Sequence, residues 1–236
     1  MAEKDPYYGR DEVSNSDLSW LHKYWQSVNV VYDLEKAYRF GTLIDCMITE
    51  VHKVNFFKLT CAGEQYTKEE FALAEEMKKA FYRDEFCATM AKHSEYQKVS
   101  IRHRFPIDYN GFGFRLNVRC KWDLFAMPKL KISGDIKSTT ATTQKQFEEV
   151  VRYFDYDRQR AWYMDIEEVN NDMLIGISKV NKKVFKVPVV RGSELYNSGK
   201  EKYQELAFKH WYLFEKLETP KSEVNGSIFQ EVLADQ

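Results

Sequence analysis

Two carboxylates and a lysine lie in the middle of this sequence at a spacing that suits metal chemistry. Asp123 follows one alternating apolar segment, and Asp135 and Lys137 lie two residues apart in the next. Residues i and i+2 of a β-strand point to the same face, so the side chains of Asp135 and Lys137 should lie together. A neighbouring strand can bring Asp123 beside them, and we expect the three to form one site.

Such a set of groups can hydrolyse a phosphodiester bond. Carboxylate oxygens bind hard cations such as Mg²⁺ or Mn²⁺. A bound metal lowers the pKa of a water molecule and stabilises charge on a phosphate. A lysine beside the metal can orient that water, or deprotonate it if the site lowers the pKa of the lysine.

The Asp-x-Lys pattern is common, and its context decides its value. Glu76 and Lys78 form a second copy, but they lie in an expected amphipathic helix, where residues i and i+2 do not share a face. A single copy is more often a solvated pair of surface charges than a site. The copy at Asp135 lies on an expected strand, follows a strand that ends at Asp123, and precedes a helix. This context favours the functional interpretation.

The elements that must position these residues follow from hydrophobic periodicity. Helical spacing covers about 17–28, 34–52, 67–82 with a further turn or two to 92, 143–166 and 194–218. Strands are predicted at about 99–107, 112–120, 130–136, 173–180 and 184–190. This order predicts a mixed α/β (α+β) domain with a central sheet.

Local signals mark some boundaries. Ser16 is expected to cap the first helix, and Thr67 with Glu70 forms a capping-box pattern. Asn110-Gly111 is a strong hairpin signal between the first two strands. An interior glycine costs about 1 kcal/mol relative to alanine. Gly41 in the second helix therefore indicates close packing or a helix break.

The chain is long enough for one large domain. We expect a flexible leader at 1–12, a single domain at 13–219 and a tail at 220–236. Within the domain we expect N-terminal helices at 13–95, the sheet and a helix at 97–190, and a C-terminal helix at 194–218.

Charge and cysteine content narrow the function classes. Lys and Arg total 35 against 36 for Asp and Glu, which counts against broad non-specific coating of DNA but allows a local basic groove. The four cysteines form no Cys-x-x-Cys pair, so a zinc or iron–sulfur site is not expected. A reduced, cytoplasmic setting fits them best. No signal peptide or membrane span is expected, because no apolar run approaches roughly 20 residues.

Two segments around the candidate site resemble a known nuclease core. Residues 119–123, Arg-Cys-Lys-Trp-Asp, and residues 134–140, Gly-Asp-Ile-Lys-Ser-Thr-Thr, resemble the PD-(D/E)xK core of the exonuclease VIII-like nucleases. These are phage and prophage recombination exonucleases, related more distantly to lambda exonuclease and the RecB nuclease domain. The resemblance implies a restriction-endonuclease-like core, with a central mixed sheet flanked by helices.

Three further segments match in the same order. Residues 13–18 are similar to the family's Ser-x-Ser-x-Leu segment, and residues 40–45 resemble its Gly-Thr-x-x-His helix, which ends in Leu-Glu near the position of Glu50. Gln159 and Tyr163 fit its Gln-x-x-x-Tyr motif. The resemblance covers about residues 13–166.

Two positions depart from the family pattern. The usual metal-binding histidine is replaced by Asp45, whose carboxylate binds a hard cation at least as well. The proline of the motif's name is Trp122, at a position that commonly varies.

The resemblance implies a Mg²⁺-dependent (or Mn²⁺-dependent) deoxyribonuclease, a hydrolase expected to act as an exonuclease on duplex DNA ends in recombination or repair. The implied metal site comprises Asp45, Asp123, Asp135 and Ile136, with Glu50 as a weaker candidate. The implied catalytic residues are Asp123, Asp135, Lys137, Gln159 and Tyr163. The implied DNA contacts are Ser138, Thr139, Gln159 and Tyr163.

Several residues keep a second interpretation. Gln159 and Tyr163 share a helix face, so they could equally form the polar edge of a buried helix. Ser138 and Thr139 could belong to a loop that caps the next helix. Glu50 could be a solvated charge.

Other functions stay open at this point. The alternatives are an endonuclease, a CRISPR- or repair-type nuclease of the same fold, and a catalytically silent DNA-binding or scaffold protein. The expected partner is DNA, with a strand-annealing recombination protein as a second candidate, in a bacterial or phage-infected cell. A homo-oligomer is expected from the ring-forming nucleases of this resemblance. The aromatic residues Trp211, Tyr212 and Phe214 could form its interface or make a second internal contact.

Overall fold

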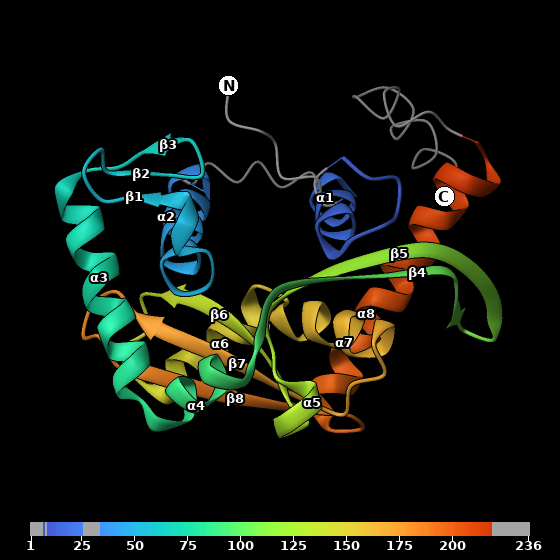
Figure 1. The fold of residues 1–236 in the computed structure, drawn as a ribbon. Helices are drawn as coiled ribbons and strands as arrows, with labels where there is room; N and C mark the ends of the chain where they lie inside the picture. Colours follow the sequence, from blue (N-terminus) through green and yellow to red (C-terminus); the bar gives the residue numbers. More distant parts are fainter. Residues whose placement is uncertain (1–6, 8, 26–33, 219–236) are drawn as a thin grey trace.

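The computed structural model describes residues 7, 9–25 and 34–218, in which helices cover both faces of a central sheet (Figure 1). The helices are α1 (Asn15–Trp25), α2 (Leu34–Thr49), a 3₁₀ turn (Val51–Lys53), α3 (Lys68–Arg83), α4 (Glu85–His93), α5 (Met127–Leu130), α6 (Gln144–Tyr153), α7 (Tyr156–Ile166), α8 (Glu194–Trp211) and a π-helical turn (Tyr212–Lys216). The strands are β1 (Val54–Asn55), β2 (Thr60–Cys61), β3 (Glu64–Gln65), β4 (Glu95–Tyr109), β5 (Phe112–Phe125), β6 (Ser133–Thr139), β7 (Asn171–Ser178) and β8 (Val184–Val190).

The central sheet has the order β4-β5-β6-β7-β8. Only β6 and β7 run parallel; the other neighbouring pairs are antiparallel. A parallel pair needs a long crossover, which α6 and α7 provide. The mixed sheet flanked by helices confirms the predicted fold class.

Alternation along the strands divides the apolar core in two. Leu174 of β7 packs with α6, α7 and α8 on one face of the sheet, whereas Ile175 packs with α2, α3 and α4 on the other. Ile136 of β6 belongs to the second core. Side chains that are neighbours in a strand point to opposite faces. A residue's parity on β6 or β7 therefore determines which helical layer it meets.

Local chemistry explains the boundaries that were predicted well. Thr67 and Glu70 form the capping box at the start of α3, because each side chain bonds to the other's backbone N–H. Asn110 and Gly111 have φ values of 52° and 80°, as a tight hairpin turn between β4 and β5 requires.

Three boundary predictions were wrong. The helix expected at 143–166 breaks into α6 and α7 around Asp155, whose φ of 53° is left-handed and whose carboxylate accepts a 2.8 Å hydrogen bond from Lys202 Nζ. Leu130 lies in α5 rather than in a strand. The first helix begins at Asn15, and Ser14, not Ser16, exchanges hydrogen bonds with Asp17.

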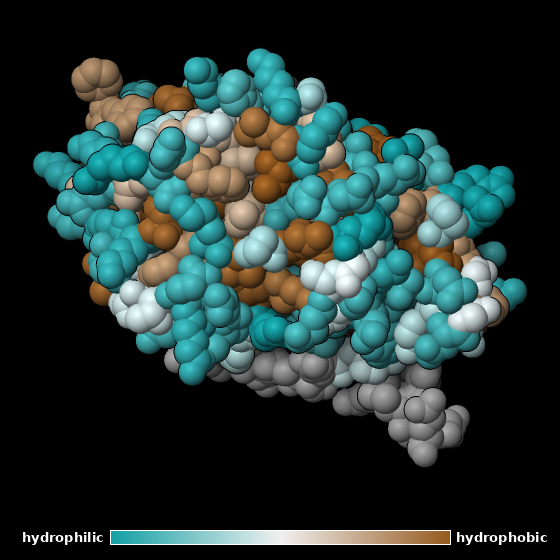
Figure 2. Space-filling view, turned by 90° about the horizontal axis from the view of Figure 1, so that it is seen from below, coloured by the Kyte–Doolittle hydropathy of each residue, from teal (hydrophilic) through white to brown (hydrophobic). Residues whose placement is uncertain are grey.

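The structure describes only part of the expected leader and of the first predicted helix, and none of the expected tail. Residues 9–12 of the expected leader approach β5, where Arg119 Nη1 donates to the Arg10 carbonyl oxygen at 2.9 Å. Residues 26–28 of the predicted first helix and the tail 220–236 lie outside the described residues. No helix within the described ranges is long and apolar enough to span a bilayer. Figure 2 shows that hydrophilic side chains dominate the underside, with hydrophobic patches between them.

Two glycines in helices predict opposite effects on stability. A Cβ at Gly199 of α8 would lie 2.2 Å from the Asp157 carbonyl oxygen of α7, whereas a Cβ at Gly41 of α2 would meet nothing within 4 Å. Gly41 thus marks neither close packing nor a break. We expect Gly199→Ala to lower the free energy of unfolding by about 3 kcal/mol, because the two helices must separate. Gly41→Ala should raise it by about 0.5–1 kcal/mol. Urea unfolding checks both, and equal effects would contradict the packing.

Candidate active site

The site lies where β5 and β6 separate. The two strands pair through Leu124 with Gly134 and Phe125 with Ser133. One residue beyond this pairing, Asp123 Oδ2 accepts a 2.8 Å hydrogen bond from the Ile136 backbone N–H. The carboxylate therefore replaces the backbone carbonyl that would accept this hydrogen bond in a continuous sheet. It pairs the Ile136 N–H at the edge of β6 from which β5 diverges.

Asp135 and Lys137 point to the same face of β6, as their spacing predicted. Lys137 Nζ lies 2.7 Å from Asp135 Oδ2. Asp135 is buried, and the Lys137 side chain keeps 19% of its surface exposed. The ammonium also lies 4.8 Å from the centre of the Tyr156 ring of α7. Solvent can thus reach the pair from one side.

Helix α2 brings a third carboxylate to this place. Gln97 Nε2 of β4 donates to Asp45 Oδ1 and Oδ2 at 3.1 and 3.0 Å. Thr49 Oγ1, one helical turn after Asp45, lies 3.1 Å from its Oδ1. The family resemblance gave Asp45 to the metal site, and its charge acts on the pKa of Asp123 together with that of Asp135, so carboxylates of three elements lie within electrostatic range of one another.

These carboxylates disfavour one another's ionised form. Burial, followed by neighbouring negative charge that includes Glu50 and Asp135, raises the pKa of Asp45 to about 7. Burial also raises the pKa of Asp123 well above its usual value, and the charges of Asp45 and Asp135 add to the shift. Nearby like charges have this effect when no cation balances them. The site therefore gains electrostatically from a cation.

Lys137 stays protonated in this environment. Burial is the largest single effect and lowers its pKa, but the charges of Asp135, Tyr156 and Asp123 together with the hydrogen bond to Asp135 outweigh it, so the net shift is upward. The downward shift that a general base would need is the opposite of what the site produces. Lys137 is therefore placed to donate a hydrogen bond and positive charge, rather than to accept a proton.

Arg160 is the main residue of the site that sequence reasoning missed. It is fully buried, its Nη1 donates to Asp135 Oδ1 at 2.8 Å, and its Nε donates to Asp172. The guanidinium lies 5.0 Å from the Trp122 ring and 4.7 Å from the Tyr163 ring. Trp122, at the family's proline position, thus provides an aromatic surface for the arginine that holds Asp135. The sequence signal that could have identified Arg160 is its position between Gln159 and Tyr163.

This network changes what a mutation at Asp135 should do. Asp135→Ala leaves the buried Arg160 with one carboxylate instead of two, and breaking a buried ion pair costs about 3 kcal/mol. We expect Asp135→Ala to lower the free energy of unfolding by about that amount, in addition to removing a candidate metal ligand. Asp135→Asn, which keeps an oxygen for Arg160 Nη1, should cost less in the same urea titration. Equal stability of the alanine variant and the wild type would contradict this role of Arg160.

The residues fit a divalent cation by type, although their present contacts must change to bind one. Among the described residues, no three His, Cys, Asp or Glu side chains stand ready to hold a metal ion. Asp123 Oδ1 forms no hydrogen bond with the described chain, and the buried Asp135 Oδ2 has only its ion pair with Lys137. Carboxylate oxygens are the ligands that Mg²⁺ and Mn²⁺ prefer. Gln97 and Lys137 would have to turn away for Asp45 and Asp135 to bind.

The remaining predicted site residues lie around this centre. Ile136 packs its side chain in the core, so it can offer a metal only its backbone carbonyl oxygen, which points to the same strand edge as its N–H. Glu50 pairs with Lys53 at 2.7 Å and is neither a solvated charge nor bonded to the carboxylates. Gln159 and Tyr163 share a helix face and approach at 3.5 Å.

The polar segment after Lys137 has mixed roles. Thr139 is buried, and its Oγ1 accepts a hydrogen bond from the Ala141 N–H at 3.1 Å. The N-cap of α6 is Thr143, so Ser138 and Thr139 do not cap this helix. Ser138 is half-buried and its hydroxyl forms no hydrogen bond with the described residues. Their DNA contacts stay a prediction.

The raised pKa of Asp45 predicts how pH and metal act on stability. Its folded pKa of about 7 exceeds its usual 3.8, so the folded state binds more protons between these values. The contribution of Asp45 to the stability of the fold is therefore lost as pH rises from about 4 to about 7. A metal requires the ionised form, so Mn²⁺ should raise the melting temperature at pH 8 and have little effect at pH 5. Asp45→Asn should weaken both dependences in differential scanning fluorimetry, and an unchanged Mn²⁺ effect would contradict the assignment.

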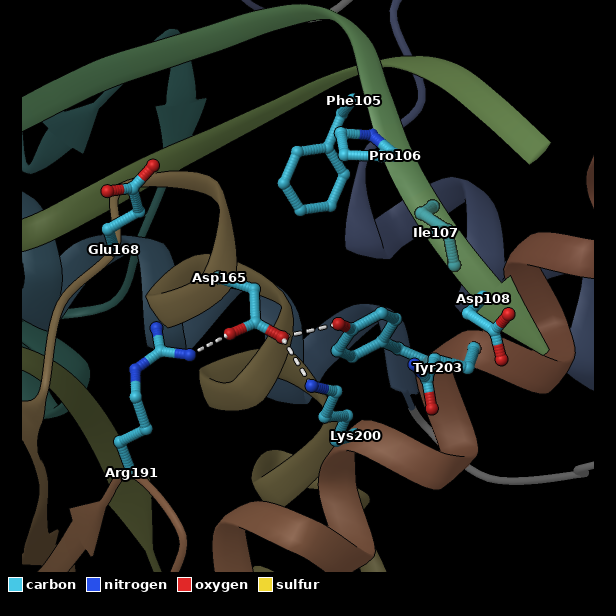
Figure 3. A pocket seen from close by; sticks show the side chains of 10 residues that line it. Phe105, Pro106, Ile107, Asp108, Asp165, Glu168, Arg191, Lys200 and Tyr203 are labelled. Carbon is cyan, nitrogen blue, oxygen red and sulfur yellow. Dashed lines mark hydrogen bonds and ion pairs between the residues drawn. The ribbon is translucent and has the colours of Figure 1, made fainter. Parts of the chain in front are cut away.

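Two other candidate centres are structural. Asp165 borders a recess of about 310 Å³, where Figure 3 shows its carboxylate facing Arg191, Tyr203 and Lys200. Its oxygens accept hydrogen bonds from Arg191, Tyr203 and Tyr196, so this acid already has its partners. The four cysteines are all free and buried.

Comparison with known proteins gives only distant likenesses. No family model and no curated protein matches the sequence. Among solved structures, the chain is similar to a phage-related exonuclease from Haemophilus somnus 129PT, with 15% sequence identity, a TM-score of 0.40, and coverage of 85% of this chain and 93% of that chain. It is also similar to SSO0001, with 10% identity, a TM-score of 0.34, and coverage of 60% of this chain and 69% of that chain. The functional argument therefore rests on the site.

Proposed function

We propose that this protein is a metal-dependent deoxyribonuclease whose site is centred on Asp45, Asp123 and Asp135. The observation that carries the proposal is the electrostatic interaction among carboxylates of α2, β5 and β6: burial and neighbouring negative charge, to which Asp135 contributes in both cases, raise the pKa values of Asp45 and Asp123. A purely structural site gains nothing from this repulsion, whereas a cation removes it. A lysine within 2.7 Å of one carboxylate completes the set that phosphodiester hydrolysis requires.

Each residue then has a distinct task. Mg²⁺ or Mn²⁺, when bound by the carboxylates and the Ile136 carbonyl, lowers the pKa of a water molecule and stabilises charge on the phosphate. Lys137 positions the water and donates to the phosphate. Arg160 fixes the orientation of Asp135 from behind. Gln159, Tyr163, Ser138 and Thr139 contact the DNA.

Exonuclease action on duplex ends, a role in recombination and a strand-annealing partner follow from the family resemblance, and we include them in the proposal. A homo-oligomer belongs to it too, because a nearly neutral chain needs a means other than charge to stay on DNA. The aromatic residues Trp211, at the end of α8, and Tyr212 and Phe214, in the π-helical turn, give this no support. The Trp211 ring lies 5.4 Å from the rings of both Phe112 and Phe114, and Tyr212 and Phe214 lie 6.2 and 4.8 Å from the rings of Phe208 and His210, so each of the three makes internal contacts.

End-labelled linear and closed circular duplexes, each with Mg²⁺ or with EDTA, test the proposal. We expect Mg²⁺-dependent loss of the linear duplex alone. Nicking of the circle would replace the exonuclease by an endonuclease of the same fold. Binding of either DNA without any Mg²⁺-dependent cleavage would overturn the nuclease and favour a silent DNA-binding protein.

A further inference from the structure

Lys179, the residue that follows β7, carries a positive charge that no carboxylate of the described chain balances. Its ammonium lies 4.5 Å from the centre of the Phe40 ring of α2, and it forms no ion pair or side-chain hydrogen bond with the described residues. The side chain is half-buried, and burial alone lowers the pKa of its ammonium. Keeping a partly desolvated charge without a partner costs stability. A function that uses this charge would explain why the position holds a lysine.

The backbone around Lys179 is held firmly. Its N–H donates to the Thr139 carbonyl oxygen at 2.8 Å, and its carbonyl oxygen accepts from Lys182 Nζ at 2.9 Å. The turn that follows is closed by Ser178 Oγ, which accepts from the N–H groups of Val180 and Asn181 at 3.2 Å. The ammonium is therefore presented from a fixed support, and binding a ligand there orders little additional chain.

Lys179 lies on the same side of the sheet as a free hydroxyl next to the active site. In the parallel pair, Ser138 is opposite Ile177, so Ser138 and Lys179 share the face that α2 covers. Ser138 directly follows Lys137, and its hydroxyl has no hydrogen-bond partner in the described chain. An ammonium and a hydroxyl donor thus lie at the ends of two adjacent strands, on the face that α2 with Asp45 covers and opposite the face of Asp135 and Lys137.

We propose that Lys179 and Ser138 bind a phosphate of the DNA backbone near the scissile bond. The assignment rests on the proposed nuclease function for its substrate. A phosphate accepts hydrogen bonds from both donors and balances the charge of Lys179. DNA contacts of this kind fix the position of the strand in the site without reading its base sequence. We therefore expect the pair to position the DNA and to add no sequence specificity.

Lys179→Met tests this contact, because methionine keeps an apolar stem against Phe40 and removes the charge. Lys92→Met, at an exposed position of α4, is the matched control. Both changes are made in an Asp123→Asn parent, so that a fluorescein-labelled duplex is not degraded. Fluorescence anisotropy is measured over a series of salt concentrations. The slope of log Kd against log salt should fall by about one in Lys179→Met and stay unchanged in Lys92→Met.

A second measurement separates lost binding from damaged structure. Lys179→Met should melt at the same temperature as its parent or higher, because it removes an unbalanced half-buried charge. An unchanged salt slope, or an equal change in the Lys92 control, overturns the proposal. A lowered melting temperature overturns it as well, because it would make Lys179 structural. Failure of the wild type to cleave DNA at all would instead overturn the nuclease function on which the contact rests.

Discussion

Asp123→Asn should retain the fold and lose DNA cleavage by on the order of 10³-fold or more, a barrier increase of about 4 kcal/mol. The asparagine side-chain oxygen can still accept the Ile136 N–H, so the hydrogen bond that joins the separating strands remains. The negative charge that attracts the metal is gone. Single-turnover cleavage of a linear duplex at saturating Mg²⁺ measures the loss.

Stability distinguishes this effect from damage to the fold. The pKa of Asp123 is raised in the folded protein, so its ionised form is unfavourable there at pH 8. Asp123→Asn removes that charge and should raise the melting temperature at pH 8. Asp108→Asn, at an exposed position of the β4–β5 hairpin, is the control for loss of one carboxylate. A fully active Asp123→Asn protein would contradict the assignment. So would a variant whose loss of activity is explained by a matching loss of folded protein.

Lys137→Ala should lower kcat by roughly 10²–10⁴-fold, the contribution of a well-placed catalytic group. Metal affinity should stay the same or become tighter, because Lys137 now neutralises Asp135 from 2.7 Å and competes with a cation for it. The separation between lost turnover and retained metal binding is the expected signature of a positioning role.

Isothermal titration with Mn²⁺ and single-turnover cleavage, made on the same preparations, check this separation. Lys92→Ala, which removes an exposed lysine of α4, is the control and should match the wild type in both. Collapse of Mn²⁺ affinity in Lys137→Ala would mean that the lysine maintains the structure of the carboxylates, and the proposed role would be wrong.

The local geometry of the site could be predicted because it depends on residues close in sequence. The two-residue spacing of Asp135 and Lys137 determines their common face once β6 is a strand. The capping box at Thr67 and the turn at Asn110 and Gly111 depend in the same way on neighbouring residues. These features involve backbone donors and steric limits within a few residues, which the sequence displays directly.

The partners that hold the carboxylates could not be predicted in this way. Gln97 reaches Asp45 across 52 positions, and Arg160 reaches Asp135 across 25. Which of many polar residues makes such a contact depends on the packing of whole elements. The break at Asp155 is similar, since Lys202, 47 positions later, bonds to a residue in a left-handed conformation. Periodicity continued through that point because both α6 and α7 bury apolar residues against the same sheet face.

The most direct test of the account is to locate the metal. Fe²⁺ substituted for Mg²⁺, with ascorbate and peroxide, generates radicals that cut the protein backbone near the bound ion, and mass spectrometry maps the cuts. We predict cuts clustered around Asp45, Asp123 and Asp135, suppressed by excess Mg²⁺ and absent in Asp123→Asn. Cuts elsewhere, or cuts at these residues that neither Mg²⁺ nor Asp123→Asn removes, would contradict a divalent metal site at the separation of β5 and β6.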